Sequence, residues 1–113
     1  MDSMPRSLAI LLLFIAALLE AGGDALIRVG LRSPSAGVRA GMFALGATVL
    51  FGYGYAVNAP GWDFGRLLGL YVVFFFVVAQ LISWLAFGQP PSRAVWLGGV
   101  LIVCGGLVIA AGQ

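Results

Sequence analysis

The sequence has no histidine and no lysine, and it has a single cysteine, Cys104. One cysteine cannot form an internal disulfide or a thiolate metal cluster, so we expect a buried, unreactive thiol at this position. Without histidine or paired cysteine, the chain also lacks the residue types that usually bind transition metals. The composition therefore predicts neither a metal site nor a cofactor.

Charge is scarce as well. Charged residues make up 9% of the 113 residues, whereas hydrophobic residues make up 62%. A soluble domain averages about 25% charged and about 45–50% apolar residues, so this chain has too few charges to cover a water-facing surface. Its arginines are scattered and form no basic patch, which indicates headgroup anchors rather than a nucleic-acid surface. We expect the lipid bilayer, and no nucleic acid, as a partner.

Catalytic motifs are the third absence. The chain has no pairing of a nucleophile with a base, no phosphate-binding glycine loop and no P-loop lysine. We therefore predict that the protein is not an enzyme. What remains to be explained is a set of long apolar segments and a few polar residues inside them.

The apolar segments are long enough to cross a membrane. A transmembrane helix needs about 20 apolar residues. Charge-free windows of that length cover residues 40–62, 67–92 and 94–113. A fourth segment, residues 7–19, becomes long enough only if it continues through Glu20, Asp24 and Arg28.

Breaks rich in proline, glycine and serine separate these segments at 33–37, 58–63 and 88–92. We predict an all-α membrane protein of four transmembrane helices with short loops. The predicted helices cover about residues 7–31, 37–57, 64–87 and 93–111. They form a single domain over residues 1–113.

The first span has an alternative interpretation as a cleaved signal peptide, because Arg6 precedes an apolar run. Pro5 and a single arginine would be a weak start for such a peptide. Orientation is open too, since the arginines are divided almost evenly between the two predicted sides. Their distribution weakly favours an external N-terminus and also permits insertion in both orientations.

The first predicted helix carries a polar stripe, Glu20, Asp24 and Arg28, spaced four residues apart and therefore on one helix face. A charge near the bilayer centre costs about 2.5–3.5 kcal/mol, so such residues face a bundle interior or a water-filled cavity. Asp24 and Arg28 have the favourable order for a neutral ion pair, which would make them purely structural. Because Arg28 cannot neutralise both acids, Glu20 is the candidate proton or cation site and Arg28 its charge compensation.

The third predicted helix is bulky, with two polar positions that we assign to the same site. Gln80 is expected to hydrogen-bond across helices. Tyr71, two to three turns earlier, is expected to line a cavity with it. The candidate substrate and proton site is therefore formed by Glu20, Asp24, Tyr71 and Gln80.

Small residues predict the packing faces. The second predicted helix has a ridge of small residues every four positions, at Ala40, Ala44, Thr48, Gly52 and Ala56. Tyr53 and Tyr55 near its end are interpreted as an interfacial aromatic belt. The fourth predicted helix has two glycine pairs seven residues apart, which we assign to dimer packing: Gly98, Gly99, Gly105 and Gly106.

These features resemble the small multidrug resistance family of the drug/metabolite transporter superfamily. The size and the four-helix layout are similar, and so is the segment Glu20–Leu31, EAGGDALIRVGL, in which a glutamate is followed eight residues later by a basic residue. The segment Leu81–Gln89, followed by the helix with Gly99 and Gly106, is similar to the end of the family's third helix and its dimerising fourth helix.

The resemblance implies a homodimer in the bacterial cytoplasmic (inner) membrane, antiparallel or of dual topology. Glu20 matches the family's essential acid, which binds protons and a cationic substrate in alternation, and Arg28 matches its basic position. The third helix departs from the family pattern Tyr-Ala-x-Trp-x-Gly-x-Gly, because residues 68–75 read LGLYVVFF. Tyr71 falls on the family's tryptophan, and bulky residues replace both glycines.

The leading hypothesis is a proton-coupled exporter of a small organic cation that works as a dimer through Glu20. Two alternatives fit the same residues. One is a non-transporting subunit or regulator of a larger membrane complex, which suits the bulky third helix. The other is one half of a lipid-carrier flippase pair, which would require a second chain of similar size.

Overall fold

The computed structural model describes residues 4–112, and within that range the regular structure consists of four helices. Their bounds are α1 (Arg6–Leu31), α2 (Ala36–Asn58), α3 (Phe64–Phe87) and α4 (Arg93–Ala111). All four are long and apolar enough to cross a bilayer. The predicted all-α membrane class is confirmed, and each predicted helix end lies within one residue of the observed end. Residues 1–3 and 113 of the predicted domain lie outside the described range.

The connection between α1 and α2 is held by two polar side chains. Ser35 is the N-cap of α2, and its hydroxyl accepts a hydrogen bond from the backbone N–H of Val38. The guanidinium of Arg39 reaches back to the open end of α1. It donates to the carbonyl oxygens of Gly30, Leu31 and Ser33. Arg39 therefore donates to carbonyls at the C-terminal end of α1 and in the turn that follows it.

The connection between α3 and α4 begins at Gly88, which has a φ of 65°. This left-handed conformation ends α3, and the N–H of Gly88 donates to the carbonyl oxygen of Trp84 at 3.1 Å. Pro90 and Pro91 cannot continue a helix. Ser92 then caps α4.

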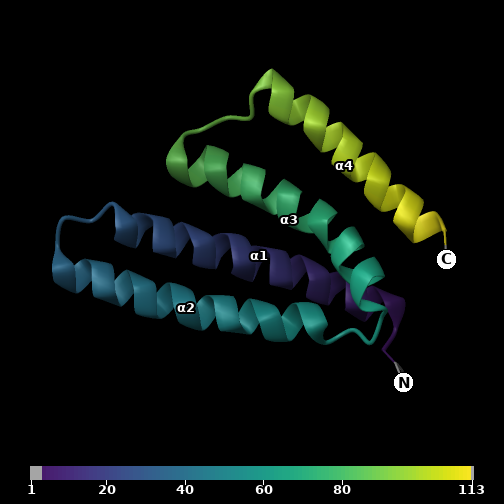
Figure 1. Ribbon diagram of the computed structural model, residues 1–113, viewed down its shortest axis with the longest axis horizontal. Helices are drawn as coiled ribbons and strands as arrows, with labels where there is room; N and C mark the ends of the chain where they lie inside the picture. Colours follow the sequence, from purple (N-terminus) through teal and green to yellow (C-terminus); the bar gives the residue numbers. More distant parts are fainter. Residues whose placement is uncertain (1–3, 113) are drawn as a thin grey trace.

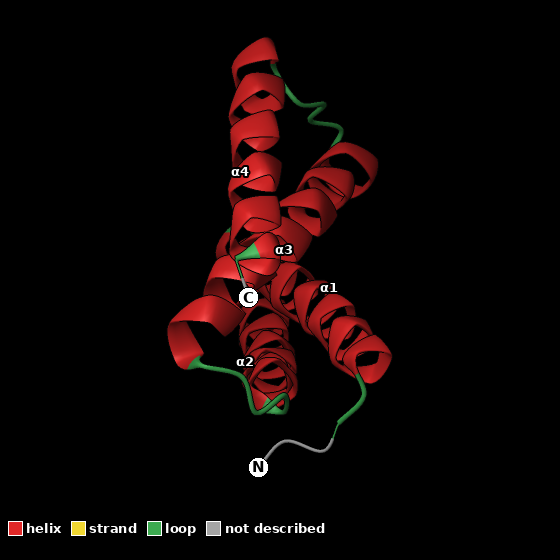
Figure 2. Ribbon diagram, turned by 90° about the vertical axis from the view of Figure 1, so that its right-hand side faces the viewer, coloured by secondary structure: helices red, strands yellow, loops and turns green. Residues whose placement is uncertain are grey.

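The helices lie across the molecule in the order α2, α1, α3, α4, as Figure 1 shows. α1 packs against both α2 and α3, whereas α4 packs along α3. The view in Figure 2 shows α4 standing away from the α1–α2 hairpin. The first helix, which carries the polar stripe, is therefore the central element of the fold.

Glycine lets the backbones of α1 and α2 approach closely. A Cβ atom at Gly23 would lie 2.7 Å from Leu50 Cγ and 3.3 Å from the carbonyl oxygen of Gly46. A Cβ atom at Gly46 would in turn lie 2.7 Å from Ile27 Cδ1. A side chain at either position would therefore separate the two helices. Gly22, in contrast, has nothing within 4 Å of its Cβ position.

The face of α2 that packs on α1 differs from the predicted ridge of small residues. Ala40, Ala44 and Thr48 of that ridge are exposed, and Thr48 donates its hydroxyl hydrogen bond to Ala44 of its own helix. The ridge prediction is therefore wrong for these three residues within this chain. The buried residues of α2 are Gly46 and Val57, on a different face.

The core lies where α1, α2 and α3 meet. Its buried members on α1 are Leu13 and the small residues Ala16, Ala17 and Ala21. They pack with residues of the other two helices, namely Val57, Leu67, Tyr71 and Val78. Outside this core, many large apolar side chains are exposed, as expected for a chain whose outer surface faces lipid.

Candidate functional site

Glu20 lies near the middle of α1 and turns toward α3. Tyr71 is buried, with 4% of its surface exposed, and its hydroxyl donates a hydrogen bond to Oε1 of Glu20 at 2.8 Å. Glu20 itself is partly buried. The fold thus brings together two of the residues that we assigned to the candidate site, although they lie 51 positions apart in the sequence.

Tyr53 of α2 packs its ring against the ring of Tyr71. Its ring centroid lies 5.7 Å from that of Tyr71, and the ring centroid of Phe75 lies 6.3 Å from that of Tyr71. We interpreted Tyr53 as part of an interfacial belt, but it packs against the core. Tyr55, two positions later, is 77% exposed. The helical phase shared by Tyr53 and Val57, four residues apart on α2, is the sequence signal that points to this inward position.

Asp24 and Arg28 line a cavity of about 210 Å³ between α1 and α3. Two polar side chains of the α3 end and its following loop also line it, Ser83 and Gln89. Neither of these was among the predicted site residues. Apolar walls come from Phe75, Ile82 and Phe87. Since Glu20 lies one turn before Asp24 on the same face, the Glu20–Tyr71 contact adjoins this cavity.

Arg28 does not pair with Asp24 in the structure. Its guanidinium carbon lies 5.3 Å from the ring centroid of Phe87, in a cation–π arrangement. Across residues 4–112, no arginine nitrogen lies within 4.0 Å of a carboxylate oxygen. The structural ion pair considered for Asp24 and Arg28 is therefore not formed, and both acids of the polar stripe lack a cationic partner in the described chain.

A second cavity, of about 400 Å³, lies at the end of α1 and shares Arg28, Phe87 and Gln89 with the first. Arg32 and Ser33 line it as well. The two cavities together extend along α1 from Asp24 to the connection between α1 and α2. The acidic part of the stripe therefore lies beside two polar cavities that share three lining residues.

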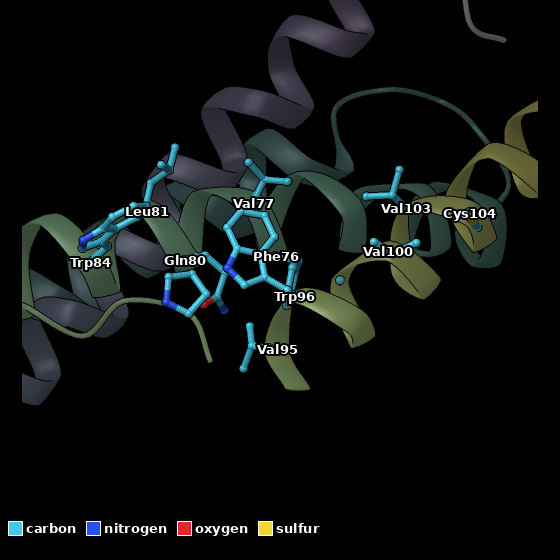
Figure 3. Close-up of a pocket in the computed structure, with 12 residues that line it drawn as sticks. Phe76, Val77, Gln80, Leu81, Trp84, Val95, Trp96, Val100, Val103 and Cys104 are labelled. Carbon is cyan, nitrogen blue, oxygen red and sulfur yellow. The ribbon is translucent and has the colours of Figure 1, made fainter. Parts of the chain in front are cut away.

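Gln80 lies elsewhere. It lines an apolar groove of about 350 Å³ between α3 and α4, together with Trp84, Trp96 and Cys104. Figure 3 shows side chains of both helices around this groove, with Gln80 among them. Its side-chain amide makes no hydrogen bond to any described residue. The fold therefore separates Gln80 from Glu20, Asp24 and Tyr71. Cys104 is exposed, so the expectation of a buried thiol is wrong.

The four glycines of α4 are divided between two faces. A Cβ atom at Gly99 would lie 2.6 Å from Phe76 Cε2, and one at Gly106 would overlap the side chain of Val73, so these two glycines pack on α3. Gly98 and Gly105 have nothing within 4 Å of their Cβ positions. Only this second pair presents a free face to another molecule. Packing of all four glycines in a dimer remains a prediction.

Within residues 4–112, no group of three or more acidic or cysteine side chains is close enough to hold a metal ion. The candidate site thus consists of two carboxyl groups, two tyrosines and an arginine with their cavity.

The chain is similar to a bacterial membrane protein over most of its length. Over 103 residues, the chain is 33% identical to the UPF0060 membrane protein YfjF of Bacillus subtilis (strain 168). The match covers 90% of this chain and 92% of that relative. No family model matches the chain, and no solved structure matches it significantly.

Proposed function

We propose that this chain, which belongs to the UPF0060 family of membrane proteins, is a proton-coupled exporter of small organic cations. Glu20 binds the proton or the cation in alternation, and the protein acts as a transporter rather than an enzyme. The similarity of Glu20–Leu31 to the small multidrug resistance family supports this function. The same similarity supports a dimer in the bacterial cytoplasmic membrane.

One observation carries the proposal. A carboxyl group lies in the middle of a membrane span, accepts a hydrogen bond from Tyr71 and has no cation within ion-pair distance in the described chain. Ionisable groups at such depth are expensive and mark proton or ion pathways. Because an acid can hold a proton when the site is empty and release it when a cation arrives, this arrangement suits exchange.

Asp24 and Tyr71 have separate parts in this mechanism. Tyr71 orients the Glu20 carboxyl group through its hydroxyl, so that the second oxygen of Glu20 remains available to a ligand. Asp24 adds a second negative charge one turn away, at the wall of the polar cavity. A cation that enters this cavity therefore meets Asp24 before Glu20.

The test is proton flux in liposomes that contain the purified protein and a pH-sensitive dye. A concentration gradient of a quaternary ammonium cation should drive proton movement, and Glu20→Gln should abolish it. Asp63→Asn is the matched control, because Asp63 is an exposed carboxyl group at the start of α3, outside the spans. Normal flux through Glu20→Gln would exclude this mechanism.

A second function is favoured by the groove between α3 and α4. Its only amide side chain, Gln80, has no hydrogen-bond partner in the described chain. In a membrane such a group usually bonds to another helix, so the groove also suits a subunit of a larger membrane complex. Purification with a stoichiometric partner, and no flux from the chain alone, would favour this alternative.

A further inference from the structure

The polar stripe of α1 continues beyond its acids with a second base. Glu20, Asp24, Arg28 and Arg32 follow one another every four residues, so the two acids of α1 are succeeded by Arg28 one turn later and by Arg32 at the C-cap of the helix. Arg28 lines both polar cavities, and Arg32 lines the cavity at the end of α1. We infer that the substrate of this site is a small zwitterion, whose cationic group meets the acids and whose anionic group meets Arg28 and Arg32. This inference rests on the proposed export function and specifies its substrate class.

Both guanidinium groups are available for an anion. Neither Arg28 nor Arg32 donates a side-chain hydrogen bond or forms an ion pair within residues 4–112. Arg39 behaves differently, because its guanidinium donates three hydrogen bonds to the carbonyls around the end of α1. A guanidinium binds a carboxylate through two parallel hydrogen bonds, which gives strength and orientation. Arg39 is thus structural, whereas Arg28 and Arg32 retain their binding capacity.

The position of the two bases disfavours a simple cation. A ligand that approaches from the α1–α2 connection passes Arg32 and Arg28 before it reaches Asp24. Like charges held close together cost several kcal/mol at an interface. A cation that also carries an anionic group replaces this repulsion with attraction, so the arginines select for the zwitterion.

The dimensions limit the substrate to a short molecule. The helical rise places Asp24 and Arg28 about 6 Å apart along the axis, and Glu20 and Arg28 about 12 Å apart. The cavity lined by Asp24 and Arg28 has a volume of about 210 Å³, which is below the ~300–1,000 Å³ of common ligand pockets. Phe75 and Phe87 form apolar walls between the charged groups. A short aliphatic spacer between the two charges of the ligand would lie against these rings.

The inference is tested by binding of two matched probes to the full-length protein in uncharged lipid nanodiscs. One probe is 5-(trimethylammonio)pentanoate, and the other is pentyltrimethylammonium, which has a methyl group in place of the carboxylate. We expect the wild-type protein to bind the zwitterion more tightly by about tenfold, the size of one close charge pair. Arg28→Gln should remove this preference by weakening the zwitterion alone, and Arg28→Lys should retain part of it.

Arg93→Gln is the matched control, because Arg93 is an exposed arginine at the start of α4 that lines neither polar cavity. It should leave the preference unchanged. If Arg28→Gln fails to fold, Arg32→Gln at the exposed end of α1 provides the same comparison. Equal binding of the two probes by the wild-type protein overturns the inference, and so does a preference that survives both arginine substitutions.

Proton flux separates this inference from the function on which it rests. If pentyltrimethylammonium drives proton flux that depends on Glu20 while the zwitterion is not preferred, the export function stands and only the substrate class is wrong. If neither probe drives flux that Glu20→Gln removes, the export function itself is wrong.

Discussion

Tyr71 and Glu20 are linked by one hydroxyl group, which is the closest polar contact between α1 and α3 in the described chain. The hydroxyl donates to one carboxyl oxygen and leaves the other free. Since Asp24 and Arg28 do not pair, nothing in residues 4–112 neutralises the charge of the ionised Glu20. The balance between a proton and a bound cation at this single residue is therefore central to the proposed transport.

Removal of that hydroxyl should destabilise the fold modestly. We expect Tyr71→Phe to lower the free energy of unfolding by about 0.6–1.7 kcal/mol, the range for hydrogen bonds between membrane helices. The ring contacts with Tyr53 and Phe75 would remain. Unfolding in mixed micelles with increasing denaturing detergent measures the change. Tyr55→Phe is the control, because Tyr55 is exposed to lipid and should have no effect. Equal stability of Tyr71→Phe and the wild type would argue against the hydrogen bond.

At the scale of elements, α1 carries three different faces. One face approaches α2 at Gly23, a second presents the polar stripe to α3, and a third exposes large apolar residues such as Leu11 and Leu18 to lipid. A helix with two protein neighbours needs small residues where it is closest to one of them. The glycine contact with α2 therefore fixes the rotation of α1, and that rotation directs Glu20 toward Tyr71.

The glycine contact predicts unequal effects of two adjacent substitutions. Gly23→Ala should lower the free energy of unfolding by about 1–3 kcal/mol, the cost of overpacking a tight contact. Its methyl group would lie 2.7 Å from Leu50 Cγ. Gly22→Ala has open space at the same depth and should be neutral or stabilising by up to about 1 kcal/mol, because alanine favours the helix. The same detergent unfolding measures both. A larger loss for Gly22→Ala than for Gly23→Ala would contradict the observed rotation of α1.

At the scale of the whole molecule, the order α2, α1, α3, α4 leaves α4 at one side, where it packs along α3 (Figure 1). Its outward surface contains Gly98 and Gly105, which lie next to no other side chain. A smooth strip of glycine permits close approach of another helix. This surface is the part of the proposed homodimer interface that the fold of one chain leaves open.

Substitution of the open glycines should separate assembly from folding. We expect Gly98→Leu with Gly105→Leu to weaken a homodimer by about tenfold or more through steric exclusion. The unfolding free energy of the single chain should hardly change, because neither position touches α3. Energy transfer between labelled copies at decreasing protein-to-lipid ratio measures the dimer. Gly99→Leu is the contrasting variant, and it should damage the chain itself through Phe76. Unchanged energy transfer in the double variant would exclude this face from the interface.

The sequence by itself determined the four spans, their ends and the face of α1 that carries the charges. These properties follow from the length of apolar segments, from proline, glycine and serine at the breaks and from the period of one helix, all of which are local. Only the tertiary structure decided which residues meet. It brought Tyr53 and Tyr71 to the polar stripe, placed Gln80 in another groove and turned Arg28 to Phe87 instead of Asp24. The reason is that the rotation of each helix about its axis depends on packing against its neighbours, which no single segment encodes.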